Sequence, residues 1–357
     1  SNDGELGVTA PFFDDEYKQF LETGAETFSF STMANIVEAQ HIVVGNYVAF
    51  VHKNETKLFH ITEVEEVHEQ EFVKTVYCEV TGIELINEIV RPMTMNSCNV
   101  SRLLDSLLSG TEWKRGVVDG SITEVKDVVI SDYTTVYSCL QEYIVGLFNA
   151  EISFSCKIEA GEVVGKFINV YSKRGNDEGY RFEYSSNVSS ISKTCDSSDL
   201  VTALIGVGKD NITFAGIEAP DKPLNQDFIS DDDSYKRWNA NGSHIMGVFK
   251  CETESKQELL SLTRKELQVR KSPKIKYELK TEVLNYDDIE IGDTVKVVDH
   301  EFNPPLQLEA RINELTISFT DVSKNECVLA NYKDIAEKER TYDDILKELR
   351  DYLASLE

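Results

Sequence analysis

The strongest candidate for chemistry is His300, which stands between two acidic residues in the run Asp299-His300-Glu301. A neighbouring carboxylate can fix the tautomer of an imidazole and so prepare it as a general base. Such a base must activate a nucleophile, and the sequence offers no identifiable serine or cysteine for that role. The run also ends an alternating apolar segment, just before a Pro-Pro loop. A role in a turn is therefore favoured, and His300 is kept as the alternative catalytic candidate.

Other signatures of catalysis or ligand binding are missing from the sequence. The 6 histidines include no His-Glu-x-x-His pattern, and none of the 7 cysteines forms a Cys-x-x-Cys pair. This cysteine usage is typical of reduced, mostly buried thiols made in a cytoplasm. Neither a phosphate loop, nor a dinucleotide fingerprint, nor a Gly-x-Ser-x-Gly elbow is present. We therefore expect no metal site and no cofactor.

The charge balance limits the possible partners. The chain of 357 residues carries 63 acidic and 36 basic residues, a net charge of −27. Electrostatic binding to nucleic acid or to anionic lipid needs clustered Lys and Arg, so both are disfavoured. Solubility alone can explain such acidity, and a second interpretation is a surface past which nucleic acid slides without adhering. No apolar run approaches the roughly 20 residues that span a bilayer, and no signal peptide is recognisable.

Two segments about 250 positions apart share one pattern of turn and strand. Residues 45–51 and 292–298 each open on Gly followed by Asn or Asp, and each continues as an alternating strand. These opening residues favour tight turns because they tolerate positive φ. A return strand begins at Ile61 in the first segment and at Ile312 in the second. The pattern predicts two similar β-units, as in a ring built from repeated wedges, although any two β-hairpins share part of it.

Composition and periodicity divide the chain into four predicted parts. Residues 1–90 alternate as strands and are expected to close as a small antiparallel β-barrel. Residues 91–185 are predicted to form an α+β domain. Residues 186–330 are predicted to contain a second, similar β-barrel with an inserted loop and helix at 217–272. Residues 331–357 are expected to form a C-terminal helix that begins a stalk.

Local signals mark several elements within these parts. Asn99 is predicted to cap a helix that carries an apolar stripe. A second helix is expected over about residues 132–148, and Ser255 with Glu258 forms a capping box that opens a third. The polar run 174–179 is predicted to turn a β-hairpin.

The candidate self-association residues lie at strand edges and in the tail. Exposed edge strands can pair between subunits, and apolar residues spaced four, three and four apart follow the a/d pattern of a coiled coil. A single amphipathic helix that folds back on its own domain is the alternative for the tail. The residues are Val48 and Val295 at the edges, and Ile345, Leu349, Tyr352 and Leu356 in the tail.

In their order along the chain, several segments resemble the N-terminal part of the tail-associated minor structural protein of siphophages and prophages of Gram-positive bacteria. This family is also called prophage endopeptidase tail, and the resemblance covers nearly all of residues 1–332. The segments that carry it are residues 26–32, 44–48, 57–61, 198–208, 292–300 and 308–312.

The resemblance implies a fold like the baseplate hub of contractile phage tails: a β-rich, multidomain α+β protein with two similar β-barrel domains. Three chains would present six barrels in a pseudo-sixfold ring that closes the tail tube and connects it to tip proteins. Three chains carry a charge of three times −27, or −81, so an acidic lumen would let DNA pass without specific binding. The implied location is the virion tail, after synthesis in the cytoplasm of the bacterial host.

The resemblance does not imply that this chain is an enzyme. Lytic activity in the family is usually attributed to a separate C-terminal domain, so no catalytic residues are carried over. Two alternatives remain open: a cell-wall endopeptidase acting within this chain, and a module that binds the host surface. Trp113 and Trp238 would be the candidate contact residues of such a module.

Overall fold

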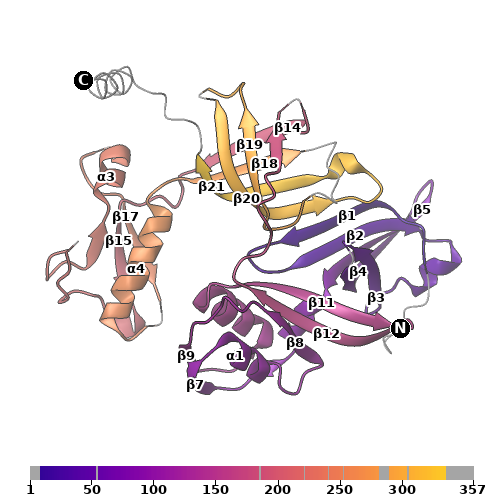
Figure 1. Cartoon of the computed structure of the whole chain (residues 1–357), viewed down its shortest axis with the longest axis horizontal. Helices are drawn as coiled ribbons and strands as arrows, with labels where there is room; N and C mark the ends of the chain where they lie inside the picture. The colour runs from indigo at the N-terminus through magenta and orange to yellow at the C-terminus, as the bar shows by residue number, and fades with distance from the viewer. Residues whose placement is uncertain are drawn as a thin grey trace, which may run out of the picture. The chain divides into compact units, whose positions relative to one another are not determined.

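The computed structural model describes residues 9–334, apart from residues 54, 185, 221, 240, 252, 281–288 and 304. The predicted tail stripe therefore lies outside the described residues. The chain separates into two compact units, both drawn in Figure 1. Unit 1 comprises Ser1–Ser192 and Glu278–Glu357, and unit 2 comprises Lys193–Tyr277.

A large sheet organises unit 1. Within the described part of the chain, eleven strands follow the order β14-β18-β21-β20-β1-β2-β5-β4-β3, with β19 paired to β20 and β13 paired to β19. The strands are β1 (Phe13–Phe20), β2 (Glu26–Met33), β3 (Tyr47–His52), β4 (Glu55–His68), β5 (Phe72–Val80), β13 (Arg181–Glu183), β14 (Ser190–Asp196), β18 (Lys274–Lys280), β19 (Thr294–Asp299), β20 (Leu306–Ile317) and β21 (Glu326–Asp334).

The two segments predicted to be similar share the same backbone geometry. Gly45 has a φ of 90° and Gly292 a φ of 89°, a conformation open to glycine because it lacks a Cβ. The N–H of Gly45 donates to the carbonyl of Ile61 at 3.1 Å, and the N–H of Gly292 donates to that of Ile312 at 2.8 Å. Directly after each isoleucine, the pairing with the next strand shifts register. The predicted internal repeat is therefore confirmed.

The repeat extends to a whole set of strands. The first β-unit has the order β1-β2-β5-β4-β3, and the second β-unit has the order β14-β18-β21-β20-β19. The two β-units join where β1 pairs antiparallel with β20, with Tyr17 opposite Ile317. Most of unit 2 lies between β14 and β18 in the chain, where the first β-unit has only the short turn between β1 and β2. The second β-unit therefore carries a large insertion that the first β-unit lacks.

The first β-unit curls around an aromatic core without closing. The ring of Tyr17 on β1 lies 5.2 Å from Phe50 and 5.5 Å from His52 on β3. No strand pairing between β1 and β3 occurs among the described residues. The prediction of a β-rich α+β fold is confirmed, but two separate barrels are not, because the described strands form no closed barrel and the two β-units share one sheet.

Most of the other elements of unit 1 follow the first β-unit along the chain. Asn99 caps α1 by accepting the N–H of Arg102 at 2.9 Å, as predicted. The helix expected over residues 132–148 is a short α2 continued by the π-helix η3. The elements are η1 (Val37–His41), η2 (Thr81–Ile86), β6 (Ile89–Val90), β7 (Met93–Cys98), α1 (Val100–Leu107), β8 (Trp113–Val118), β9 (Lys126–Ile130), β10 (Thr134–Thr135), α2 (Val136–Cys139), η3 (Leu140–Leu147), β11 (Glu151–Glu159), β12 (Glu162–Tyr171) and η5 (Val322–Lys324).

The hairpin predicted at residues 174–179 is wrong. β12 pairs with β11 and β8, whereas β13 leaves this turn to pair in parallel with β19. The hairpin in this region is β11–β12 instead, and it turns at Ala160 and Gly161, which have φ values of 52° and 87°. Positive φ at two consecutive turn residues matches the tight type I′ turn.

Unit 2 is a three-stranded sheet with one long helix. The sheet has the order β16-β15-β17, and Ser255 caps α4 by accepting the N–H of Glu258 at 3.4 Å, as the capping box predicted. Its core is Val201, Leu204, Phe214, Ile229, Leu259, Leu260 and Leu267. The elements are β15 (Ala203–Val207), η4 (Lys209–Asn211), β16 (Phe228–Ser230), α3 (Asp232–Trp238), β17 (Met246–Lys250) and α4 (Lys256–Arg270). Among the helices described in either unit, none is long and apolar enough to cross a membrane.

Candidate functional site

The two predicted edge residues have different surroundings. Val48 is half-buried on β3, which ends the order of the described strands and leaves one side of its backbone without a strand. Val295 is only 1% exposed on β19, and β13 pairs along the outer side of that strand, with Phe182 opposite Val297. An intersubunit role for either residue stays a prediction. The tail candidates Ile345, Leu349, Tyr352 and Leu356 lie outside the described residues.

The surroundings of His300 are those of a turn. His300 is exposed directly after β19. The carboxylate of Asp299 is buried and accepts the N–H of Glu301 at 2.8 Å, so it closes a turn. Within the described ranges, no group of three His, Cys, Asp or Glu side chains could hold a metal ion.

A buried ion pair links two strands of the first β-unit. Lys57 Nζ on β4 lies 3.1 Å from Glu26 Oε1 on β2, and both side chains are nearly inaccessible to solvent. The hydroxyl of Tyr17 donates to Glu26 Oε2 at 2.7 Å. Breaking such a pair leaves an uncompensated buried charge, which strongly destabilises a fold. Glu26, Lys57 and Tyr17 therefore fix β1, β2 and β4 in one arrangement.

The electrostatics keep this pair ionised. Burial opposes the charged form of Glu26, but Lys57, Tyr17 and Arg174 together outweigh it and lower the pKa of the carboxyl group. Burial likewise opposes the charge of Lys57, yet Glu26 and Glu55 raise its pKa. Burial and the Glu26 carboxylate raise the pKa of Tyr17, so its hydroxyl stays a donor. The cluster is a fixed set of charges with no group poised to exchange a proton near neutral pH.

A second ion pair holds the α+β part of unit 1 against the second β-unit. The guanidinium of Arg311 on β20 contacts both carboxylate oxygens of Glu151 on β11, at 2.6 and 3.1 Å. It also donates to the carbonyls of Arg174 and Gly292, at 2.8 and 3.1 Å. The backbone N–H of Arg174 donates to Glu151 as well, at 2.6 Å. Bidentate Arg–carboxylate pairs of this kind add geometric specificity, so this clasp fixes where β11 meets β20.

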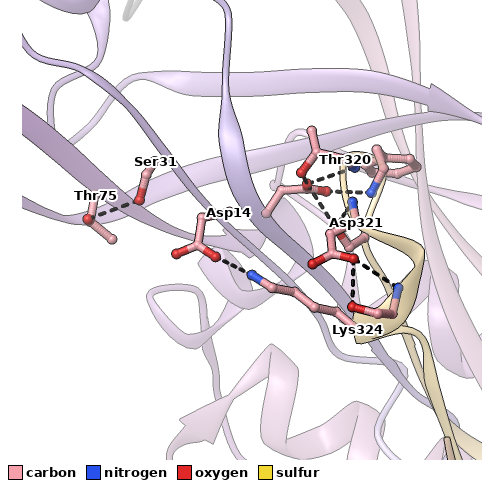
Figure 2. A network of polar contacts seen from close by, with 10 residues as sticks. Asp14, Ser31, Thr75, Thr320, Asp321 and Lys324 are labelled. Carbon is pink, nitrogen blue, oxygen red and sulfur yellow. Dashed lines mark hydrogen bonds and ion pairs between the residues drawn. The ribbon is translucent and has the colours of Figure 1, made fainter. Parts of the chain in front are cut away.

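A third network anchors the loop between β20 and β21 to β1. Asp15 is fully buried, and its carboxylate accepts the N–H of Phe319 at 2.7 Å, the N–H of Thr320 at 3.1 Å and the hydroxyl of Ser318 at 3.0 Å. Figure 2 shows Lys324 of the same loop reaching back to Asp14. The first β-unit thereby holds a loop of the second β-unit through two consecutive acidic residues, Asp14 and Asp15.

A cavity of about 310 Å³ between β1, β3 and β11 gathers most of the basic groups of this region. Each of its lysine and arginine side chains has at least one polar partner. Lys53 lies 3.4 Å from Glu290, Lys173 donates to Thr294 at 3.3 Å, and Arg174 donates to the carbonyl of Ile152 at 3.2 Å. The cavity thus lies within the network of polar contacts that joins β1, β3 and β11.

Sequence reasoning missed these three networks, because each joins residues far apart in the chain. One signal was available for the ion pair. Glu26 occupies the same face of its strand as Phe28, and Lys57 the same face as Phe59. A charged residue in the apolar phase of an alternating strand indicates a buried partner.

The fold is similar to that of several phage tail proteins of known structure. The chain is similar to the 43 kDa tail protein of prophage MuSo2 from Shewanella oneidensis, with a TM-score of 0.61 and 12% identity over 90% of this chain and 94% of the other. A tail protein from Neisseria meningitidis MC58 gives a TM-score of 0.61 and 10% identity over 90% and 91%. Prophage tail protein gp18 from Listeria monocytogenes EGD-e gives 0.56 and 10% over 96% and 95%.

The model of the prophage endopeptidase tail family matches residues 176–338. This confirms the resemblance predicted from the sequence over the part of the chain that holds unit 2 and all five strands of the second β-unit. A comparison with curated protein sequences finds no match. The family name mentions an endopeptidase, but the surroundings of His300 and the three networks described above provide no catalytic arrangement.

Proposed function

We propose that the chain is a structural hub protein of a phage tail, in which three copies form a pseudo-sixfold ring. The ring closes the tail tube, contacts the tube proteins on one side and connects to tip proteins on the other. The observation that carries this proposal is the repeat of five strands in one order, because two similar β-units per chain give six in a trimer. The four domains predicted from the sequence remain part of the proposal.

The solution mass of the intact chain tests this proposal. Three times the chain mass of 40.4 kDa gives about 121 kDa, which light scattering should detect at high protein concentration. A monomer at every concentration would contradict ring formation by this chain alone. The double variant Ile345→Lys, Leu349→Lys tests the tail stripe separately, since an unchanged trimer mass would reject a role for it.

The charge of the chain supports passage of DNA without specific binding. With a net charge of −27 per copy, the protein should not shift DNA in a gel at physiological salt. Retention of DNA at that salt would contradict a repelling lumen.

The enzymatic alternative has its own test. The protein is incubated with peptidoglycan, and soluble fragments are measured for the natural chain and for His300→Ala. The structural proposal expects no cleavage by either protein. Cleavage that disappears in His300→Ala would replace it with the endopeptidase interpretation.

A further inference from the structure

The junction between the two β-units provides a template for a contact between two copies. On β20, residues 306–311 pair with β19, and residues 314–317 pair with β1. The N–H of Leu21, just after β1, extends this pairing by donating to the carbonyl of Asn313 at 2.9 Å. β20 therefore has two neighbours on one side, one after the other.

β4 is the counterpart of β20 in the first β-unit. On the corresponding side it pairs with β3, the counterpart of β19, but with no counterpart of β1 among the described strands. Residues 55–60 of β4 pair with β3, just as residues 306–311 of β20 pair with β19. The two ranges differ by a constant 251 positions (306 − 55 and 311 − 60). By this displacement, residues 63–66 correspond to residues 314–317, where β1 binds β20. On that side of β4 no strand lies beyond β3 in the described part of the chain. Glu63 and Glu65 are exposed there.

β14 is the counterpart of β1, and among the described strands it has a neighbour on one side only. It lies next to β18 in the strand order, as β1 lies next to β2, and it ends the order of the described strands. Six of its seven residues are exposed. Exposed edges of this kind are templates for pairing with another chain. The chain contains the β1–β20 junction once. It also exposes the counterpart of each strand of that junction, namely β14 for β1 and residues 63–66 of β4 for residues 314–317 of β20.

We propose that β14 of one copy pairs antiparallel with residues 63–66 on β4 of a second copy, repeating the β1–β20 junction between chains. The contact joins two different surfaces, so it runs head to tail and closes into a ring when the rotation permits. It rests on the proposed ring and adds to it the strands that form the interface. All junctions of the ring, within and between chains, would then use one type of strand pairing.

A cysteine scan of β4 tests the pairing directly. Cys195 lies exposed on β14, and opposed strand residues have the Cα separations that a disulfide needs. Residues 63 to 67 are replaced by Cys one at a time in the full chain, which is then oxidised mildly at high concentration. Each variant is repeated with Cys195→Ser. The matched control is Glu159→Cys, an exposed strand residue of β11.

The expected result is a disulfide-linked species between copies, strongest at one scanned position and weak at its sequence neighbours, which face the other side of the strand. It should vanish with Cys195→Ser and be absent from Glu159→Cys. A trimer that shows no link at any scanned position would overturn the strand pairing and leave the ring intact. A monomer would overturn both. Equal linking of Glu159→Cys would show random collision and would also overturn the pairing.

Discussion

Glu26 carries much of the stability of the first β-unit, because it is the anion to which Lys57 and Tyr17 both bind. Glu26→Gln should lower the free energy of unfolding by about 3 kcal/mol, since the buried Lys57 ammonium then keeps only the exposed carboxylate of Glu55 as an anionic partner. Urea unfolding at neutral pH measures this. The control is Glu16→Gln, which breaks the half-exposed pair with Lys18 and should cost less than about 1 kcal/mol. Equal effects of the two variants would contradict the special role of Glu26.

The same carboxyl group predicts how stability depends on pH. Its pKa in the folded protein lies below the ordinary value of 4.5, so folding favours the ionised form. The stabilisation is fully present above that ordinary value and is lost as the pH falls through the lower folded pKa. The unfolding free energy should therefore decline below about pH 4.5, and less steeply in Glu26→Gln. Parallel acid profiles for the two proteins would show that other carboxylates dominate.

Asp15 gives a second prediction at this scale. Asp15→Ala removes the acceptor for two backbone N–H groups and for hydroxyls of the loop after β20, so it should destabilise unit 1 by about 3 kcal/mol. Thermal unfolding measures the loss. Asp14→Asn changes only the exposed pair with Lys324 and should stay within about 1 kcal/mol. Should the two variants unfold at the same temperature, the anchoring role of Asp15 would be refuted.

At the scale of elements, local signals predicted what local contacts determine. The caps at Asn99 and Ser255 and the Gly-turn repeat were readable because the residues involved lie within a few positions of one another. The turn at 174–179 was misjudged because the partner of β13 is β19, more than 100 residues later. Pairing between distant strands depends on the whole core and leaves no local mark. The open curl of the first β-unit, in place of a barrel, is of this kind.

The paired glycines of the repeat provide a matched test of this framework. Both have a φ near 90°, so alanine is strained at either position. At Gly45 an added Cβ meets nothing within 4 Å, whereas at Gly292 it would lie 2.8 Å from the carbonyl oxygen of Arg174. Gly292→Ala should therefore destabilise the protein by about 1–3 kcal/mol more than Gly45→Ala, as urea unfolding can show. Equal losses of unfolding free energy in the two variants would mean that the backbone of Arg174 can move away from the added Cβ at little cost.

At the scale of the whole molecule, charge opposes assembly. Copies with a net charge of −27 repel one another, and salt screens this repulsion over about 10 Å at roughly 0.1 M. The trimer fraction at a fixed protein concentration should therefore rise between about 0.02 M and about 0.5 M NaCl. Sedimentation measures it. Dissociation on adding salt would instead show that intersubunit ion pairs outweigh the repulsion.

The insertion of unit 2 in only one of the two β-units has a consequence for symmetry matching. If every position around a tube were filled by an identical single-unit subunit, any appendage would occur at all positions and crowd the neighbouring ones. Because both β-units are part of one polypeptide, the first can keep a short turn between its first two strands while the second carries unit 2 at the same place. In the proposed ring, a chain with two similar but unequal β-units would thus adapt a sixfold partner to a threefold arrangement of the inserted unit.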